Sequence, residues 1–226
     1  MKIGEQRYPV IYLLHGYGGN HTTWPAIVDL TYLSDLYRVI FVCPDGGKDS
    51  WYLDSKVKSR SMYMTYITEE LVCQIDSLFP TLPHADGRVI IGSSMGGHGA
   101  LTILASNPEL FSGAGSISGI MDLGEFPKHW RLPRVLGPYK ENVALWWEHS
   151  FLGMISALQG KEKKIIIHCG TDDFALAGNR RAHQKLEEHS VSHKYVEMPG
   201  DHTLDFVSSV FEEQLGFLIS DFKDFR

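Results

Sequence analysis

The chain has 226 residues, of which 43% are apolar and 21% are charged, and its formal net charge is −6. This composition is that of a soluble globular protein of one domain, and a chain of this length buries enough surface to need neither disulfides nor a structural metal. Because charges of one sign do not gather into a block, nucleic acid and anionic membranes are not expected partners.

The first residues give no sign of export or membrane insertion. No apolar run approaches the ~18 residues of a membrane-spanning helix, and MKIGE is not followed by the apolar core of a signal peptide. Three cysteines are an odd number for a disulfide framework. We therefore expect a cytoplasmic protein, with a periplasmic or secreted location as the alternative if a signal peptide has been removed.

Short β-branched runs alternate along the chain with amphipathic stretches of helical length, which is the pattern of repeated βα units. Several runs are apolar at every position, as in a parallel sheet with helices on both faces. The predicted strands are residues 8–14, 37–43, 88–92, 113–118, 164–169 and 193–198. The predicted helices are residues 24–35, 65–79, 96–106, 177–189 and 203–222.

One connection is longer than a plain loop. Residues 119–163 carry several aromatic side chains among glycines and prolines, and an insertion of this kind typically forms a lid or a pocket wall. Trp130, Trp146 and Trp147 are its candidate substrate-binding residues. The chain has no linker or repeat, so we predict one domain over residues 1–226 that includes this insertion.

The strongest local motif is GSSMG at residues 92–96, between a predicted strand and a predicted helix. In a nucleophile elbow the serine lies on a strained strand-to-helix turn, and both positions two residues away must be glycine to avoid a collision. Only Ser94 meets this condition, because Ser93 is flanked at those positions by Ile91 and Met95. The alternative is an ordinary tight turn.

A serine nucleophile needs a base, and the base needs an acid that orients it. In a hydrolase with such an elbow, the acid and then the base follow later strands. Asp173 follows the fifth predicted strand and is our candidate acid, with Asp172 as the alternative. His202 lies in a glycine-containing loop after the last strand and is our candidate base. A zinc site is not expected, because His-Glu-x-x-His is absent from the sequence.

The tetrahedral intermediate needs hydrogen-bond donors at its oxyanion. The backbone N–H of Met95, directly after the nucleophile, is one candidate. The glycine-rich loop at residues 15–20 follows the first predicted strand, and the N–H of Tyr17 is the second candidate. The alternative for this loop is a turn that only reverses the chain.

The loop at residues 44–54 follows the second predicted strand and opens onto the same end of the sheet. Trp51 and Tyr52 are therefore candidates to line the acyl or alcohol site. Packing within the loop is the alternative for both.

Five motifs in order resemble one family: YPVIYLLHGYGGN, PDGGKDSWYLDS, GSSMGGHGAL, CGTDDF and PGDHT. They resemble the esterase family that includes esterase-D-like proteins, feruloyl and tributyrin esterases, S-formylglutathione hydrolases and mycolyltransferases. The resemblance implies an α/β-hydrolase fold with a mostly parallel sheet. It also implies Ser94, Asp173 and His202 as nucleophile, acid and base.

The chain departs from that family in two places. Family members usually carry one or two strands before the first one predicted here, and only seven residues precede residue 8. Either the chain is shortened or the sheet lacks those edge strands, and an uncovered edge favours a homo-oligomer. The other departure is Gly-Tyr-Gly-Gly at residues 16–19, where S-formylglutathione hydrolases have a Gly-Leu-Thr-Cys type of sequence.

These observations predict a serine carboxylesterase that forms an acyl-enzyme and uses no cofactor or metal. The expected substrate is a small-molecule or carbohydrate ester with an acetyl, short-chain or feruloyl group. The alternatives are an acyltransferase on the same scaffold, an S-formylglutathione hydrolase-like thioesterase, and a non-catalytic binding protein that retains the pocket. The second departure argues against the thioesterase.

Overall fold

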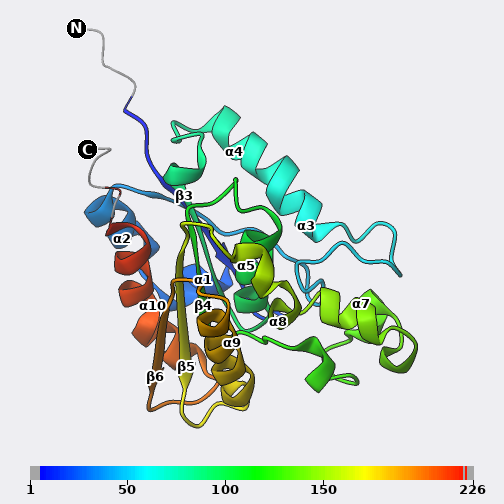
Figure 1. The fold of residues 1–226 in the computed structure, drawn as a ribbon. Coiled ribbons are helices and arrows are strands. Elements are labelled where there is room, and N and C mark those ends of the chain that lie inside the picture. The colour runs from blue at the N-terminus through cyan, green and yellow to red at the C-terminus, as the bar shows by residue number, and fades with distance from the viewer. Residues whose placement is uncertain (1–5, 221, 223–226) are drawn as a thin grey trace, which may run out of the picture.

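The computed structural model describes residues 6–220 and 222, and its centre is one parallel sheet (Figure 1). The strand order is β2-β1-β3-β4-β5-β6, and every neighbouring pair is parallel. The strands are β1 (Val10–Leu14), β2 (Ile40–Val42), β3 (Arg88–Ser93), β4 (Gly113–Ile117), β5 (Lys164–Gly170) and β6 (Lys194–Met198). All six predicted strands are present, and β2 is shorter than predicted because the preceding helix continues to Tyr37.

The sheet is buried on both faces, as the continuous apolar runs predict. In β1, Ile11 and Leu13 face one core cluster while Tyr12 and Leu14 face the other, and all four are fully buried. Helices on one side are α1 (Thr23–Ile27), α2 (Leu30–Tyr37) and α10 (Leu204–Leu218). Helices on the other side include α5 (Met95–Ser106), α8 (Phe151–Met154) and α9 (Leu176–Glu188).

The helix predicted over residues 24–35 is divided into α1 and α2. Val28, which follows α1, has an extended backbone, and Asp29 starts a new helix because its carboxylate accepts a hydrogen bond from the N–H of Tyr32 at 3.0 Å. Such a side-chain cap satisfies one of the free donors at a helix start. The local capping therefore overrides the amphipathic period that predicted one continuous helix.

The helix predicted over residues 65–79 contains a wider segment. It consists of α3 (Tyr63–Thr65), a π-helical segment (Tyr66–Leu71) and α4 (Val72–Leu78). The Thr68 hydroxyl donates to the carbonyl of Met64 at 2.9 Å. A hydroxyl that bonds back in this way competes for the helical acceptor and can distort a helix.

The insertion at residues 119–163 folds into short helical segments, of which α8 packs on α5. They are α6 (Pro133–Leu136), α7 (Val143–Glu148) and α8, with 3₁₀ turns at Leu123–Glu125, Tyr139–Glu141 and Ile155–Leu158. Trp146 and Phe151 are fully buried. The insertion therefore extends the hydrophobic core as well as lying beside the carboxyl end of the sheet.

Because all the strands are parallel, the loops after β1, β3, β5 and β6 meet at one end of the sheet. These loops carry the candidate residues Tyr17, Ser94, Asp173 and His202. Among the described residues, no helix is both long enough and apolar enough to cross a bilayer.

Candidate active site

Ser94 lies on a strained turn between β3 and α5. Its backbone has φ 54° and ψ −115°, and its N–H donates to the carbonyl of Ile117 at 2.9 Å. Non-glycine residues rarely adopt this positive φ. A Cβ atom on Gly92 would collide with the backbone of Gly96, and one on Gly96 would collide with the carbonyl of Leu14. The two glycines are thus needed for the reason that the motif predicts.

The tertiary structure brings Ser94, Asp173 and His202 into one hydrogen-bonded series. His202 Nε2 lies 2.9 Å from Ser94 Oγ, and His202 Nδ1 lies 2.9 Å from both carboxylate oxygens of Asp173. We assign the proton to Nδ1, because an ionised carboxylate can only accept. Nε2 is then free to accept the proton of the Ser94 hydroxyl.

The Asp173 carboxylate is fully buried and is held by several donors. Burial on its own would raise the pKa of this group. The hydrogen bond from His202, the nearby Ser118 hydroxyl and the N–H of Ala175, which donates at 2.8 Å, outweigh burial and hold the pKa of Asp173 below its usual value. Asp173 is therefore ionised at neutral pH and can stabilise a protonated imidazole.

Asp172 directly precedes Asp173 in the same turn. Asp172 is exposed, and its N–H donates to the carbonyl of Gly200 at 2.9 Å. Its carboxylate lies 3.5 Å from the Thr171 hydroxyl. The structure therefore places Asp173, and not the alternative Asp172, against His202.

The glycine-rich loop after β1 lies directly beside Ser94. A Cβ atom added to Gly16 would lie 3.5 Å from the Cβ of Ser94. Within the described residues, the N–H groups of Tyr17 and Met95 donate to no protein acceptor. Both candidate oxyanion donors are therefore free to bind a ligand atom.

His15, which the sequence analysis did not assign to the site, holds this loop. Its Nδ1–H donates to the carbonyl of Gly16 at 2.8 Å, and its Nε2 accepts from the N–H of Gly46 at 2.9 Å. Burial lowers the pKa of His15, so the ring stays neutral and can make both bonds. His15 thereby ties the loop after β1 to the loop after β2.

A pocket of about 480 Å³ opens at Ser94 and His202. It is lined by Gly16, Tyr17, Gly18, Gly19, Thr23, Ser93, Ser94, Ser118, Trp130, Phe174, His202, Thr203, Leu204 and Val207. None of these lining residues is Asp, Glu, Lys or Arg. The pocket is therefore suited to an uncharged ligand with apolar groups.

Trp130 is the insertion's contribution to this lining. Sequence reasoning missed Phe174, although it directly follows the candidate acid, and it missed Leu204 and Val207. The last two begin α10, directly after His202. The available signal was the position of Phe174 directly after Asp173 and of Leu204 two residues after His202.

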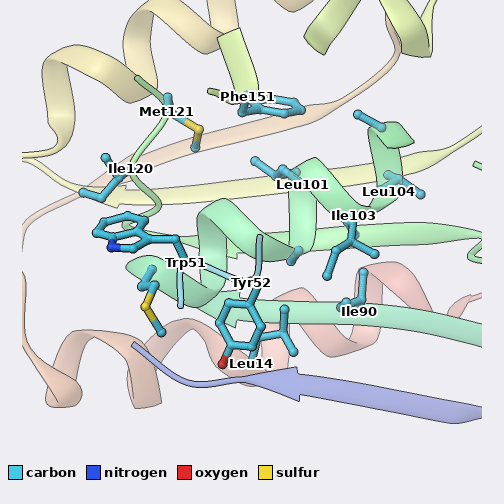
Figure 2. Packing of buried hydrophobic residues seen from close by; sticks show 14 of the residues in the cluster. Leu14, Trp51, Tyr52, Ile90, Leu101, Ile103, Leu104, Ile120, Met121 and Phe151 are labelled. Carbon is cyan, nitrogen blue, oxygen red and sulfur yellow. The ribbon is translucent and has the colours of Figure 1, made fainter. Parts of the chain in front are cut away.

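Trp51 and Tyr52 do not line the pocket, which corrects the prediction for both. They are 1% and 0% exposed and belong to the core cluster around α5 (Figure 2). The Tyr52 hydroxyl donates to the carbonyl of His15 at 3.1 Å, and the Trp51 Nε1–H donates to the carbonyl of Trp130 at 3.3 Å. Both rings support the residues that shape the site and lie beneath them.

Two tryptophans of the insertion are also outside the pocket lining, contrary to the prediction. Trp146 is fully buried, and its Nε1–H donates to the carbonyl of Gly137 at 3.1 Å. Trp147 is 43% exposed, and the Lys185 ammonium lies 4.7 Å from its ring centroid. Trp146 therefore packs the interior of the insertion, and Trp147 faces α9.

The described residues contain no group of three or more His, Cys, Asp or Glu side chains that could hold a metal ion. The cysteines among them form no disulfide: Cys73 is exposed, Cys169 is buried and Cys43 is partly buried.

Comparison with solved structures identifies the class of fold. The fluorophosphonate-binding serine hydrolase F of Staphylococcus aureus superposes with a TM-score of 0.83 and 20% identity, over 95% of this chain and 84% of that one. An S-formylglutathione hydrolase from Agrobacterium tumefaciens superposes with a TM-score of 0.82 and 22% identity, over 95% and 84%. The chain thus has the α/β-hydrolase fold.

The sequence places the chain more narrowly within that class. It belongs to the family named "Putative esterase", whose model matches residues 3–217. It is 28% identical to an acetyl esterase of Caldicellulosiruptor saccharolyticus, over 93% of this chain and 84% of the relative. It is 30% identical to an esterase of Mycobacterium tuberculosis, over 86% of this chain and 48% of the relative. The protein is therefore a carboxylic ester hydrolase.

Proposed function

We propose that this protein is a serine esterase that hydrolyses an uncharged carboxylic ester through a covalent acyl-enzyme. Ser94 is the nucleophile, His202 the general base and then the general acid, and Asp173 the residue that orients His202. The observation that carries the proposal is the pair of 2.9 Å contacts of His202, one with Ser94 and one with Asp173, beside a pocket.

In the first half of the reaction, Ser94 Oγ attacks the ester carbonyl while His202 Nε2 takes the hydroxyl proton. The N–H groups of Tyr17 and Met95 then stabilise the oxyanion of the tetrahedral intermediate. As this intermediate collapses, the ester C–O bond breaks and His202 gives its proton to the leaving alcohol. In the second half, His202 activates water in the same way, and the acid and free Ser94 are released.

The pocket supports a neutral substrate. The glutathione part of a thioester carries carboxylates, and none of the lining residues is Lys or Arg. Trp130 and Phe174 instead present apolar surface beside His202, with their ring centroids 5.6 Å apart. We propose an acyl group that is either small, such as acetyl, or flat and apolar, such as feruloyl, on an uncharged small-molecule or carbohydrate alcohol.

A phosphonate ester that reacts only with an activated serine tests the mechanism. We expect one label per chain on the peptide that contains Ser94, and none in the Ser94→Ala variant. Chelators are expected to leave ester hydrolysis unchanged, because no step uses a metal. A labelled Ser94→Ala protein, or an unlabelled wild type, would contradict the proposed nucleophile.

A panel of p-nitrophenyl esters of increasing chain length, together with methyl ferulate, tests the acyl group. We expect the highest kcat/KM for the acetyl ester or for methyl ferulate, and poor hydrolysis of long flexible chains. Adding glycerol or a sugar as an acceptor separates hydrolase from acyltransferase. Release of free acid at an unchanged rate supports the hydrolase, and diversion into a new ester indicates the transferase.

A further inference from the structure

Four loops at the carboxyl end of the sheet place aromatic rings in a series of contacts that ends on His202. The Phe174 ring centroid lies 4.4 Å from that of the imidazole, and the planes are inclined by 34°. Trp130 lies 5.6 Å from Phe174, and Trp51 lies 5.8 Å from Trp130. The loops after β2, β5 and β6 and the insertion are thereby connected through side chains.

Trp130, in the middle of this series, is held from several sides. Its backbone and that of Arg131 have φ values of 47° and 56°. Non-glycine residues keep this conformation only where surrounding contacts hold it. Here Trp51 donates to the Trp130 carbonyl, and Phe126 packs on the Trp130 ring at 4.8 Å. Trp130 is therefore a fixed support for the next ring.

Phe174 differs from its neighbours because it is 50% exposed although it directly follows the buried Asp173. Its ring lines the pocket and covers His202, whose side chain is 23% exposed. Without a neighbouring contact, a phenylalanine ring at the surface would exchange between rotamers. The contact with the Trp130 ring holds the Phe174 ring in one rotamer.

The reaction makes two demands on His202 that such a ring can meet. The imidazole must keep Nδ1 on Asp173 and Nε2 on Ser94 at the same time, and a ring packed on its face limits its rotation. When Nε2 takes the Ser94 proton, the imidazole becomes a cation. An aromatic face within about 6 Å attracts a cation, so the contact strengthens as the charge forms.

We propose that Phe174 is a positioning residue for His202. Its ring holds the imidazole between Asp173 and Ser94 and stabilises the protonated form of the imidazole, and Trp130 holds the Phe174 ring in place. This inference rests on the proposed triad, since a role for Phe174 requires His202 to be the base. It assigns a function to the residue after the acid that goes beyond lining the pocket.

The test compares Phe174→Leu with Phe174→Tyr on p-nitrophenyl acetate, whose acyl group is too small to depend on a pocket wall. We expect Phe174→Leu to lower kcat by about 5- to 30-fold, the upper part of the range that a contact between a cation and an aromatic face supplies, with a smaller change in KM. Phe174→Tyr keeps the ring and is expected to retain kcat within about 2-fold. Trp130→Leu is expected to lie between the two.

Phe79→Leu is the matched control, because Phe79 is 48% exposed, follows α4 and does not line the pocket. It is expected to leave kcat unchanged. A second readout is the low-field proton resonance of the His202 Nδ1–H, which reports the hydrogen bond to Asp173. We expect this resonance to be broadened by exchange in Phe174→Leu and retained in Phe174→Tyr.

Two results would overturn the inference: an unchanged kcat in Phe174→Leu, whether or not KM changes, or an equal loss of kcat in Phe174→Tyr. If Phe174→Leu does not fold, Trp130→Leu carries the test, and an unchanged kcat in that variant would overturn the inference. Failure of the proposed function gives a different result. The wild type would then not be labelled, or Ser94→Ala would retain activity, and neither outcome depends on Phe174.

Discussion

The loops that carry Ser94, Asp173 and His202 and the insertion at residues 119–163 lie at the same end of the molecule, but they relate to the sequence in different ways. Each loop places one polar side chain at a strand end, and the three meet at 2.9 Å. The insertion is rich in aromatic residues, yet Trp130 is its contribution to the pocket lining. A strand end therefore locates a functional side chain much better than aromatic content does.

The reason lies in what each residue type can do. A short turn after a parallel strand has few backbone conformations, so the direction of the following side chain is nearly set. A large apolar ring is stabilised equally well in a core or in a pocket wall. Trp146 and Trp130 thus have the same chemistry, but one is buried among helices and the other reaches the site.

The largest expected effect tests the loops that carry Ser94, Asp173 and His202. Ser94→Ala removes the hydroxyl that attacks the ester, and because triad members act as a unit, we expect kcat to fall by a factor on the order of 10⁶. The circular dichroism spectrum is expected to match that of the wild type. Retention of more than a few per cent of the activity would contradict the nucleophile assignment.

The adjacent acids give a sharper version of the same test. Asp173→Asn leaves the shape of the turn but favours the wrong imidazole tautomer, so we expect a loss on the order of 10⁴ in kcat. Asp172→Asn is the matched control, since its exposed side chain lies beside the Thr171 hydroxyl, and it is expected to cost less than about 3-fold. Steady-state kinetics measure both losses of kcat. A larger loss in Asp172→Asn than in Asp173→Asn would assign the role of the acid to Asp172.

The two tryptophans of the insertion test the other side of the comparison. Trp130→Ala removes a pocket wall and is expected to change the ranking of acyl groups by roughly 10- to 200-fold in kcat/KM. Trp146→Ala removes a fully buried ring, so we expect a loss of ~3–5 kcal/mol in unfolding free energy and an unchanged ranking. If Trp146→Ala changed the ranking and Trp130→Ala did not, the two assignments would be exchanged.

The last expected effect concerns the interface between α5 and the insertion, where His98 is buried. Its Nε2–H donates to the carbonyl of His149 at 2.8 Å, and burial lowers the pKa of His98 to about 4. The unfolded chain then binds the proton more readily than the folded one. The stability due to neutral His98 is complete above about pH 6.5 and decreases as the pH falls towards 4, by about 3 kcal/mol in total.

Urea unfolding at several pH values measures this effect. His98→Gln can keep the bond to His149 and cannot titrate, so its stability is expected to fall less steeply between pH 6.5 and 4 than that of the wild type. Equal slopes would show that His98 is not buried in its neutral form. The other histidines with lowered pKa, His15 and His168, are common to both proteins and cancel in the comparison.

Much of this molecule could be predicted from the chain because the information is local. The six strands follow from runs of β-branched residues, and the position of Ser94 follows from the two glycines that flank it. The division between α1 and α2 was missed, because the cap made by Asp29 interrupts an amphipathic period that continues across it. The π-helical turn at Tyr66–Leu71 was missed as well, because one regular helix was predicted across it.

The pocket was harder to predict because side-chain burial is a property of the assembled fold. Trp51 and Tyr52 follow a strand as the site residues do, but their loop turns back beneath α5 and buries both rings. Phe174 was overlooked although it directly follows the acid, because its contact with the imidazole of another loop is formed only in the assembled fold.

By itself, then, the sequence determined the order of the strands along the chain, the elbow at Ser94 and the candidates Asp173 and His202, because backbone geometry at glycines and strand ends depends on near neighbours. The tertiary structure alone decided that Trp130 and Phe174 reach the pocket while Trp51, Tyr52 and Trp146 do not. The physical reason is that an apolar ring is stabilised wherever the fold excludes water from it, and that place depends on segments far apart in the chain.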